Sequence, residues 1–192
     1  MPKTCLTIAD FLPRSKVNGP GIRSVLWVQG CPLRCAGCFN PDFLPFTGGK
    51  SVAPEQTAEW MLAEADTEGV TFSGGEPFAQ AAALAQVAAR VQAGGKGVLI
   101  FTGCDYPALQ ASRNTGVQQL LAHADLLIAG PYVSELACRE PLRASANQNV
   151  VYLTERYRNA TLAAGKLEYR IGLSGEIAIT GFPTLANPII RS

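Results

Sequence analysis

Three cysteines lie close together in one short segment of the chain: Cys31, Cys35 and Cys38. The other three cysteines stand singly, so the six do not form the regular pattern of a disulfide framework. A group of this kind is more typical of a metal or iron–sulfur site. Thiolates hold iron–sulfur clusters, and a cubane [4Fe-4S] cluster ordinarily takes four of them. Three thiolates in one loop leave one iron without a protein ligand, open to a small molecule.

Structural zinc also takes closely spaced cysteines, with a fourth ligand from elsewhere in the chain. Cys104 or His123 would supply that ligand, and the chain would then be a zinc-binding interaction module. The spacing favours iron–sulfur and leaves zinc as the alternative. A Ser-His-Asp hydrolase is not indicated, because the single histidine would have to be the base and no nucleophile elbow is present.

The elements that must position the cysteines alternate between apolar strands and helices. We expect strands over residues 23–29, 69–73, 97–102, 125–129 and 149–153. We expect helices over residues 54–66 and 78–92, with shorter helical segments between 106 and 123. Apolar strands separated by helices are typical of a parallel sheet covered on both faces. The pattern predicts an α/β fold, namely a partial, open β/α barrel of five parallel strands rather than a closed barrel of eight.

The residues that could do chemistry gather at the carboxyl ends of these strands, where parallel folds place their sites. The cysteine group follows the first strand, Gly74, Gly75 and Glu76 end the second, and Thr102 ends the third. Two adjacent glycines let the backbone approach a ligand closely because no Cβ intervenes. Glu76 either lies near a ligand or stabilises the start of the following helix.

The tail of the chain has a different pattern. Residues 168–172 and 176–180 alternate between apolar and polar side chains around a turn, which predicts a β-hairpin. We expect a barrel domain over residues 1–157 and a hairpin extension packed on it over residues 158–192. The hairpin is expected to bury an apolar face against the barrel and to cover an edge of the open sheet. That face would consist of Tyr169, Ile171, Ile177 and Ile179.

Composition limits the class of protein. The chain has 192 residues, of which 47% are hydrophobic, so one domain with a full core is expected. Sixteen Lys and Arg face fifteen Asp and Glu, and a net charge of +1 gives no case for nucleic acid or an anionic membrane. The sequence shows neither a run of about 20 apolar residues nor a secretory signal. A cytoplasmic location is therefore expected.

Several segments between residues 5 and 157 resemble a known family. They are residues 18–23 (NGPGIR), 29–41 (QGCPLRCAGCFNP), 73–77 (SGGEP) and 147–148 (NQ). Their order and content are similar to those of the radical S-adenosylmethionine superfamily, and within it to the activating proteins of anaerobic ribonucleoside-triphosphate reductase. Several motifs in one order make this resemblance far more specific than the cysteines alone.

The resemblance implies one [4Fe-4S] cluster on Cys31, Cys35 and Cys38, with the amine and carboxylate of S-adenosylmethionine on the fourth iron. One electron would cleave the sulfonium to methionine and a 5'-deoxyadenosyl radical, which takes a hydrogen atom from a glycine of a partner, a glycyl radical enzyme. The electron would come from a small reducing protein such as a flavodoxin or ferredoxin. The protein would position the cofactor and exclude solvent.

The resemblance also implies roles for residues around the cluster. Gly37 and Phe39 flank the last cysteine, in the segment placed along the adenine. Gly74 and Gly75 would bind the methionyl amine, and Glu76 would add negative charge near it. For each residue, a structural role is the alternative.

Four further polar residues have two interpretations each. Thr102 reaches the ribose or is an ordinary strand end. Asn147 closes the pocket or satisfies loop backbone. Arg23 binds the ligand carboxylate or pairs with an acid, and Asp125 contacts the ligand or is a solvated cap.

Three alanines depart from the family pattern and bear on the partner: Ala129, Ala144 and Ala146. They concern the identity of the hydrogen-atom donor and not the chemistry at the cluster. The leading hypothesis is a glycyl radical enzyme activase. A radical S-adenosylmethionine enzyme that modifies another peptide or a small molecule is the second, since a fold does not determine a substrate.

Overall fold

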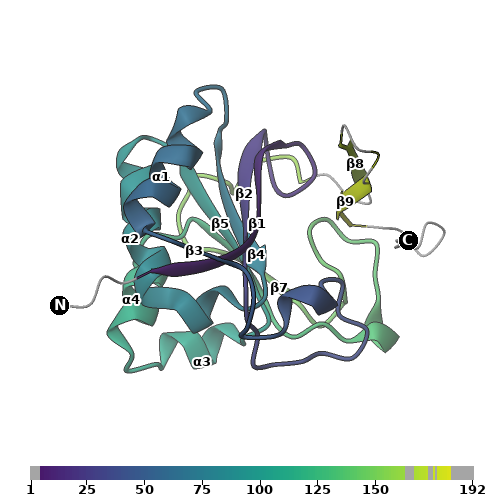
Figure 1. Cartoon of the computed structure of the whole chain (residues 1–192). Coiled ribbons are helices and arrows are strands. Elements are labelled where there is room, and N and C mark those ends of the chain that lie inside the picture. The colour runs from purple at the N-terminus through teal and green to yellow at the C-terminus, as the bar shows by residue number, and fades with distance from the viewer. Residues whose placement is uncertain (1–4, 163–166, 173–174, 176, 183–192) are drawn as a thin grey trace.

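A mixed β-sheet forms the body of the protein in the computed structural model, which describes residues 5–162, 167–172, 175 and 177–182 (Figure 1). Within that part of the chain the strand order is β3-β1-β2-β4-β5-β6-β7. The strands are β1 (Leu6–Ser15), β2 (Arg23–Val28), β3 (Lys50–Val52), β4 (Gly69–Gly74), β5 (Gly97–Thr102), β6 (Leu126–Ala129) and β7 (Asn149–Tyr152). The predicted open α/β architecture with parallel strands is confirmed.

Strands β2, β4, β5 and β6 are mutually parallel, whereas β1, β3 and β7 join antiparallel at the two sides. The expectation of a fifth parallel strand over residues 149–153 was therefore wrong. A parallel return needs a crossover over a face of the sheet, usually by a helix. The segment between β6 and β7 contains only the short 3-10 turn Ser134–Leu136. The chain therefore re-enters the sheet at the end where β6 finishes, and β7 runs antiparallel to β6.

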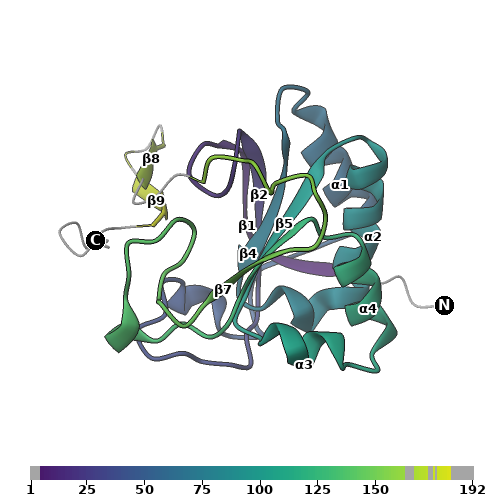
Figure 2. The same cartoon turned by 180° about the vertical axis from the view of Figure 1, so that it is seen from behind.

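The helices lie on one face of the sheet (Figures 1 and 2). They are α1 (Pro54–Ala63), α2 (Ala81–Ala93), α3 (Tyr106–Gln110) and α4 (Thr115–Ala122). Alternate residues of the strands face opposite sides, so Ile100 packs in the core under the helices while Leu99 packs with Leu142 and Tyr157 on the other side. Helices thus cover one face rather than the expected two, and loops cover part of the other. None of the described helices is long and apolar enough to cross a membrane.

Two strands, β1 and β3, lie in segments without an expected element. The alternation in β1 is broken because its pairing with β2 shifts register twice, between Ile8 and Asp10 and between Leu12 and Ser15. Each irregularity adds a residue that interrupts the period of two. Strand β3 has only three residues, too few for a pattern.

A separate hairpin, β8 (Leu167–Ile171) and β9 (Ile177–Gly181), lies on the side of the sheet opposite the helices (Figure 1). The predicted C-terminal hairpin is thus confirmed. Among the described residues it forms no ladder with the seven-stranded sheet, so the expected cover of a sheet edge stays a prediction. The division into domains at residue 157 stays a prediction.

The hairpin contacts the body through its polar side chains. Ser15 Oγ donates a hydrogen bond of 2.6 Å to Glu168 Oε2, Arg170 pairs with Asp10 at 2.7 Å, and Asn18 donates to Thr180 Oγ1 at 3.0 Å. Three of the four side chains expected to be buried are instead exposed, by 60% for Tyr169, 75% for Ile171 and 62% for Ile177, whereas Ile179 is half-buried. That expectation was wrong because ion pairs and hydrogen bonds with β1 and the loop after it hold the polar face inward.

Candidate functional site

A cavity of about 960 Å³ lies at the carboxyl ends of the parallel strands. It brings together most of the residues that the sequence pointed to, namely Cys31, Cys35, Cys38, Phe39, Gly74, Gly75, Glu76 and Thr102. Gly37 and Asn147 are not among its lining residues. Hairpin residues, including Tyr169, Arg170 and Ile177, form another part of the wall. The cavity is large enough for a nucleoside-sized ligand beside an inorganic cluster.

The cysteine loop is held in place by residues 42–45, which we call the return segment and which bind the end of β2 and the start of the loop. The backbone N–H of Gly30 donates to Phe43 O at 2.8 Å, and that of Cys31 donates to Leu44 O at 3.0 Å. The buried side chain of Gln29 donates to the carbonyl oxygens of Asp42 and Pro45, at 3.1 and 2.8 Å. Gln29 is therefore a positioning residue, and its place in the motif was its only signal in the sequence.

The three thiols differ in their surroundings. Cys31 is buried, whereas Cys35 and Cys38 are half-buried. Burial is the main factor that raises the pKa of Cys31, and the charges of Glu76 and Cys35 add to it. The backbone N–H groups of Leu33 and Arg34 act in the opposite direction. Binding of iron to Cys31 would therefore displace a proton that the apoprotein holds firmly.

The donor set suits an iron–sulfur cluster. Three thiols from one loop line one cavity, and thiolates are the usual ligands of such clusters. Among the described residues, no three His, Cys, Asp or Glu side chains are arranged around the position of a single metal ion. A cubane binds each thiolate to a different iron, so its ligands surround a group rather than converge on one ion.

The glycine turn at the end of β4 packs directly on the cysteine loop. Gly75 N donates to Val28 O at 2.8 Å, and Glu76 N donates to Gly30 O at 2.9 Å. A Cβ on Gly75 would overlap the carbonyl oxygen of Gly30, the residue before Cys31. The chain's own backbone therefore already requires glycine here. The predicted contact with a methionyl amine remains a prediction.

Glu76 is buried, and both of its carboxylate oxygens accept hydrogen bonds. Its Oε1 accepts hydrogen bonds from Phe78 N at 2.9 Å and Thr102 Oγ1 at 2.8 Å, and its Oε2 accepts one from Gly103 N at 2.9 Å. It thus caps the 3-10 turn Pro77–Gln80 and ties the end of β4 to that of β5. Glu76 therefore has the structural role that was its alternative, at the start of the following turn. It also lines the cavity.

Replacing Glu76 by Gln is expected to lower stability by about 1–3 kcal/mol, because the amide would point a donor at a buried N–H donor. Burial raises the pKa of the Glu76 carboxyl above its ordinary value of 4.5. The folded state then holds the proton more tightly, so the contribution of Glu76 is full below pH 4.5 and declines as the pH rises through the folded pKa. Thermal unfolding of both proteins at several pH values should show that the difference in their free energies of unfolding becomes smaller as the pH rises. A difference that becomes larger would contradict this assignment.

An aromatic pair forms the wall beside the last cysteine. The rings of Phe39 and Tyr132 lie 4.8 Å apart, and both side chains line the cavity. Burial raises the pKa of the Tyr132 hydroxyl, and charges at Glu135 and Cys38 raise it further. Tyr132 was not among the residues expected at the site. Its position just after β6, at the carboxyl end of a parallel strand, was the signal that would have found it.

Asn147 lies in the loop between β6 and β7. Its Nδ2 donates to Pro131 O at 2.7 Å, while its buried Oδ1 has no hydrogen-bond partner in the part of the chain that the structure describes. The neighbouring Gln148 lines the cavity, donating to Gly130 O at 3.1 Å and accepting from Ala144 N at 2.8 Å. Gln148 thus braces the loop, and a ligand contact of Asn147 stays a prediction.

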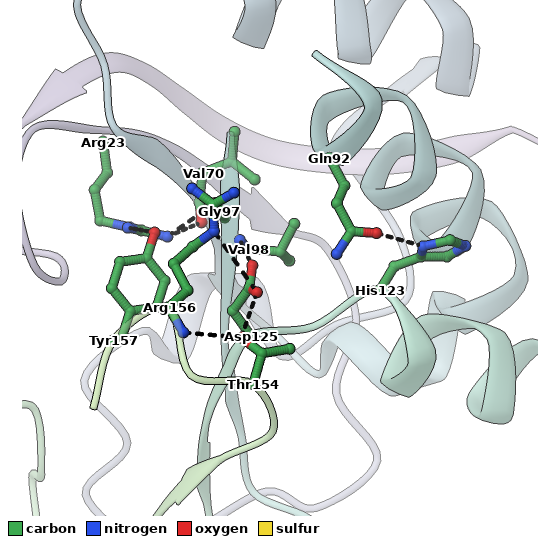
Figure 3. Close-up of polar contacts among 10 residues, drawn as sticks. All are labelled: Arg23, Val70, Gln92, Gly97, Val98, His123, Asp125, Thr154, Arg156 and Tyr157. Carbon is green, nitrogen blue, oxygen red and sulfur yellow. Dashed lines mark hydrogen bonds and ion pairs between the residues drawn. The ribbon is translucent and has the colours of Figure 1, made fainter. Parts of the chain in front are cut away.

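The opposite end of the sheet carries a polar cluster unrelated to the cavity (Figure 3). Arg23 is fully buried and donates to Tyr157 Oη at 2.8 Å and to Thr71 Oγ1 at 2.8 Å. Asp125 accepts from Val98 N at 2.8 Å and from Thr154 Oγ1 at 2.7 Å. Arg23 therefore binds no ligand carboxylate, and Asp125 is neither a solvated cap nor a ligand contact. Both fix the amino ends of the parallel strands.

The two residues considered as the fourth ligand of zinc do not line the cavity with the three cysteines. His123 follows α4 and pairs with Gln92 Oε1 of α2 at 2.8 Å, near the amino ends of the strands (Figure 3). Cys104 packs against the core under the helices and does not line the cavity. Burial, with the charge of Glu76, raises the pKa of Cys104 to about 11. Neither residue therefore completes a zinc site, and the described residues hold no group of three such ligands around one ion.

Comparison with known proteins gives the class. A family model described as a 4Fe-4S single cluster domain matches residues 17–151. The anaerobic ribonucleoside-triphosphate reductase-activating protein of Vibrio cholerae serotype O1 is 32% identical over 150 residues, 72% of this chain and 93% of the relative. The pyruvate formate-lyase-activating enzyme of Staphylococcus epidermidis is 37% identical over 122 residues, 58% of this chain and 47% of the relative. The crystal structure of QueE from Escherichia coli superposes with a TM-score of 0.42 at 16% identity, over 52% of this chain and 53% of the other.

The chain belongs to the 4Fe-4S single cluster domain family. Within that family it is a radical S-adenosylmethionine enzyme of the kind that activates glycyl radical enzymes, as the predicted resemblance implied. One [4Fe-4S] cluster and S-adenosylmethionine are the cofactors of this class.

Proposed function

We propose that Cys31, Cys35 and Cys38 hold the [4Fe-4S] cluster and that S-adenosylmethionine lies in the adjoining cavity. The observation that supports this is the gathering of three thiols and the glycine turn around one space. When bound and reduced, the cluster supplies one electron to the sulfonium, whose C5'–S bond breaks to give methionine and a 5'-deoxyadenosyl radical. A flavodoxin or ferredoxin is the proposed source of the electron.

The chain's own residues orient the ligand and exclude water. Phe39 and Tyr132 provide an apolar wall beside Cys38, suited to the face of the adenine. Thr102 lines the cavity and donates a hydrogen bond to Glu76, near the place proposed for the ribose. Gln29 and the return segment keep the cysteines at a fixed distance from the glycine turn. Such preorganisation limits the freedom of a reactive radical to meet solvent.

The proposed partner is an anaerobic ribonucleoside-triphosphate reductase. The support is the Vibrio cholerae relative, which this chain matches over nearly the whole of that relative's length. The 5'-deoxyadenosyl radical takes one hydrogen atom from a glycine Cα of the partner, which leaves 5'-deoxyadenosine and a glycyl radical. Pyruvate formate-lyase is a second candidate partner, because the Staphylococcus epidermidis relative is also similar.

The proposal is tested by anaerobic reconstitution with iron and sulfide, followed by chemical reduction and addition of S-adenosylmethionine. We expect 5'-deoxyadenosine and methionine in equal amounts without a partner, and a glycyl radical signal in electron paramagnetic resonance when the reductase is added. Cleavage without a radical on either candidate partner would contradict the partner assignment. Absence of cleavage in a protein with a full cluster would contradict the function itself.

A further inference from the structure

We propose that the outward face of the β8–β9 hairpin is the docking surface for the partner segment that carries the reacting glycine. This inference rests on the proposed function and adds to it the surface by which the protein substrate is recognised. We call this surface the hairpin face and define it as Leu167, Tyr169, Ile171, Ile177 and Ile179.

The hairpin face follows from the register of the two strands. Residues directly opposite in an antiparallel pair lie on the same side of the sheet. Ile171 is opposite Ile177, and Tyr169 is opposite Ile179, so these four apolar side chains share one side. The other side carries Glu168 opposite Thr180, and Arg170 opposite Ala178.

The polar side is the one attached to the body of the protein. Glu168, Arg170 and Thr180 bind Ser15, Asp10 and Asn18 in and just after β1. A surface hairpin ordinarily buries its apolar side and exposes its polar side. This hairpin instead exposes Tyr169, Ile171 and Ile177, three of the six exposed large apolar side chains among the described residues, while Leu167 and Ile179 are half-buried.

An apolar surface of this kind, exposed by more than half at three side chains, is typical of an interaction site. The neighbouring cavity indicates what binds there. Tyr169, Ile177 and Ile179 of the hairpin face also line the cavity that holds the three cysteines. The hairpin face is therefore continuous with the space in which the hydrogen atom must be transferred.

This continuity identifies the occupant by its chemistry. A glycine that loses hydrogen in the cavity must arrive as part of a polypeptide, and the residues beside it must pass over the rim. The hairpin face forms an apolar part of that rim, so it suits an extended segment with apolar side chains next to the glycine. The side chain of Ile171 lies beyond the cavity lining and contacts only the flank of such a segment.

The test uses the cluster-loaded full-length protein with Ile171→Asp, the conservative variant Ile171→Val, and Leu136→Asp as a control. Leu136 is an exposed apolar residue outside both the cavity and the hairpin face. The probes are anaerobic ribonucleoside-triphosphate reductase and pyruvate formate-lyase from the same organism. Affinity for each is measured without oxygen, together with the yield of 5'-deoxyadenosine when no partner is present.

We expect Ile171→Asp to weaken binding of the reductase at least about tenfold, the order expected when a buried isoleucine contact is lost. Ile171→Val and Leu136→Asp should bind like the wild type, and all variants should cleave S-adenosylmethionine without partner at the wild-type rate. Equal affinity of Ile171→Asp and wild type, or no binding of either probe to wild type, would overturn the docking proposal. So would sedimentation as a dimer that Ile171→Asp dissociates, because a second copy would then cover the face. Failure of the wild type to cleave S-adenosylmethionine would instead refute the proposed function.

Discussion

Replacement of Cys31, Cys35 or Cys38 by Ala is expected to abolish both the cluster and the cleavage of S-adenosylmethionine. Each thiolate holds one iron, and a cubane with only two protein ligands loses the arrangement that leaves a single iron open to the substrate. Reconstituted wild type should contain about four irons per chain. Iron, sulfide and 5'-deoxyadenosine are the quantities to measure.

The matched control is Cys104→Ser. Cys104 is at the end of β5 near the site but does not line the cavity. Its protonated thiol, with a pKa of about 11, behaves as a small apolar side chain. Iron content and cleavage should therefore stay at the wild-type level. Loss of the cluster in Cys104→Ser, equal to that in Cys31→Ala, would show that the ligand assignment is wrong.

Replacement of Gly75 by Val is expected to remove the cluster as well as the binding of S-adenosylmethionine. Sequence alone predicts loss of ligand affinity with an intact cluster, since glycine was expected to serve the ligand. In the structure, a Cβ at Gly75 overlaps Gly30 O, so the cysteine loop itself must shift. Overpacking of this kind costs roughly 1–3 kcal/mol, which for a chain of this size lowers the melting temperature by several degrees.

Gly95→Ala serves as the comparison for Gly75→Val. Gly95 follows α2, has a positive φ of 83°, and a Cβ there meets no atom within 4 Å. Gly95→Ala measures how much stability is lost when a glycine of positive φ is replaced away from the site. We expect Gly95→Ala to lose some stability and keep full iron content. A Gly75→Val protein that binds four irons normally but no S-adenosylmethionine would restore the ligand explanation for the turn.

The parallel centre of the sheet was predictable because its strands are short and apolar and helices lie between β2 and β4, between β4 and β5, and between β5 and β6. The same rule failed at residues 149–153, because an apolar strand has the same composition whether it runs parallel or antiparallel. What decides the direction is the connection, and the loop before β7 contains only a 3-10 turn. Strand β1 was missed because two register shifts disrupt its alternation.

The candidate site was predictable where residue type determines chemistry. The three cysteines and the glycine turn stand at strand ends, and the structure places them around one cavity. Partners far apart in sequence were not predictable. The ties from Glu76 to Thr102 and Gly103 depend on how β4 and β5 meet, and the orientation of the hairpin depends on pairs such as Arg170 with Asp10. An alternating strand shows that it has an apolar face but not which way that face points.

Isotope transfer from the partner to 5'-deoxyadenosine tests directly whether this chain takes a hydrogen atom from a glycine. The reductase is prepared with glycine that carries deuterium at Cα, and is mixed with reduced, cluster-loaded protein and S-adenosylmethionine. We expect deuterium in the 5'-deoxyadenosine and a radical spectrum without the splitting from the remaining glycine proton. Unlabelled 5'-deoxyadenosine, together with an unchanged spectrum or none, would contradict the claim that this chain activates its partner by taking a hydrogen atom from glycine.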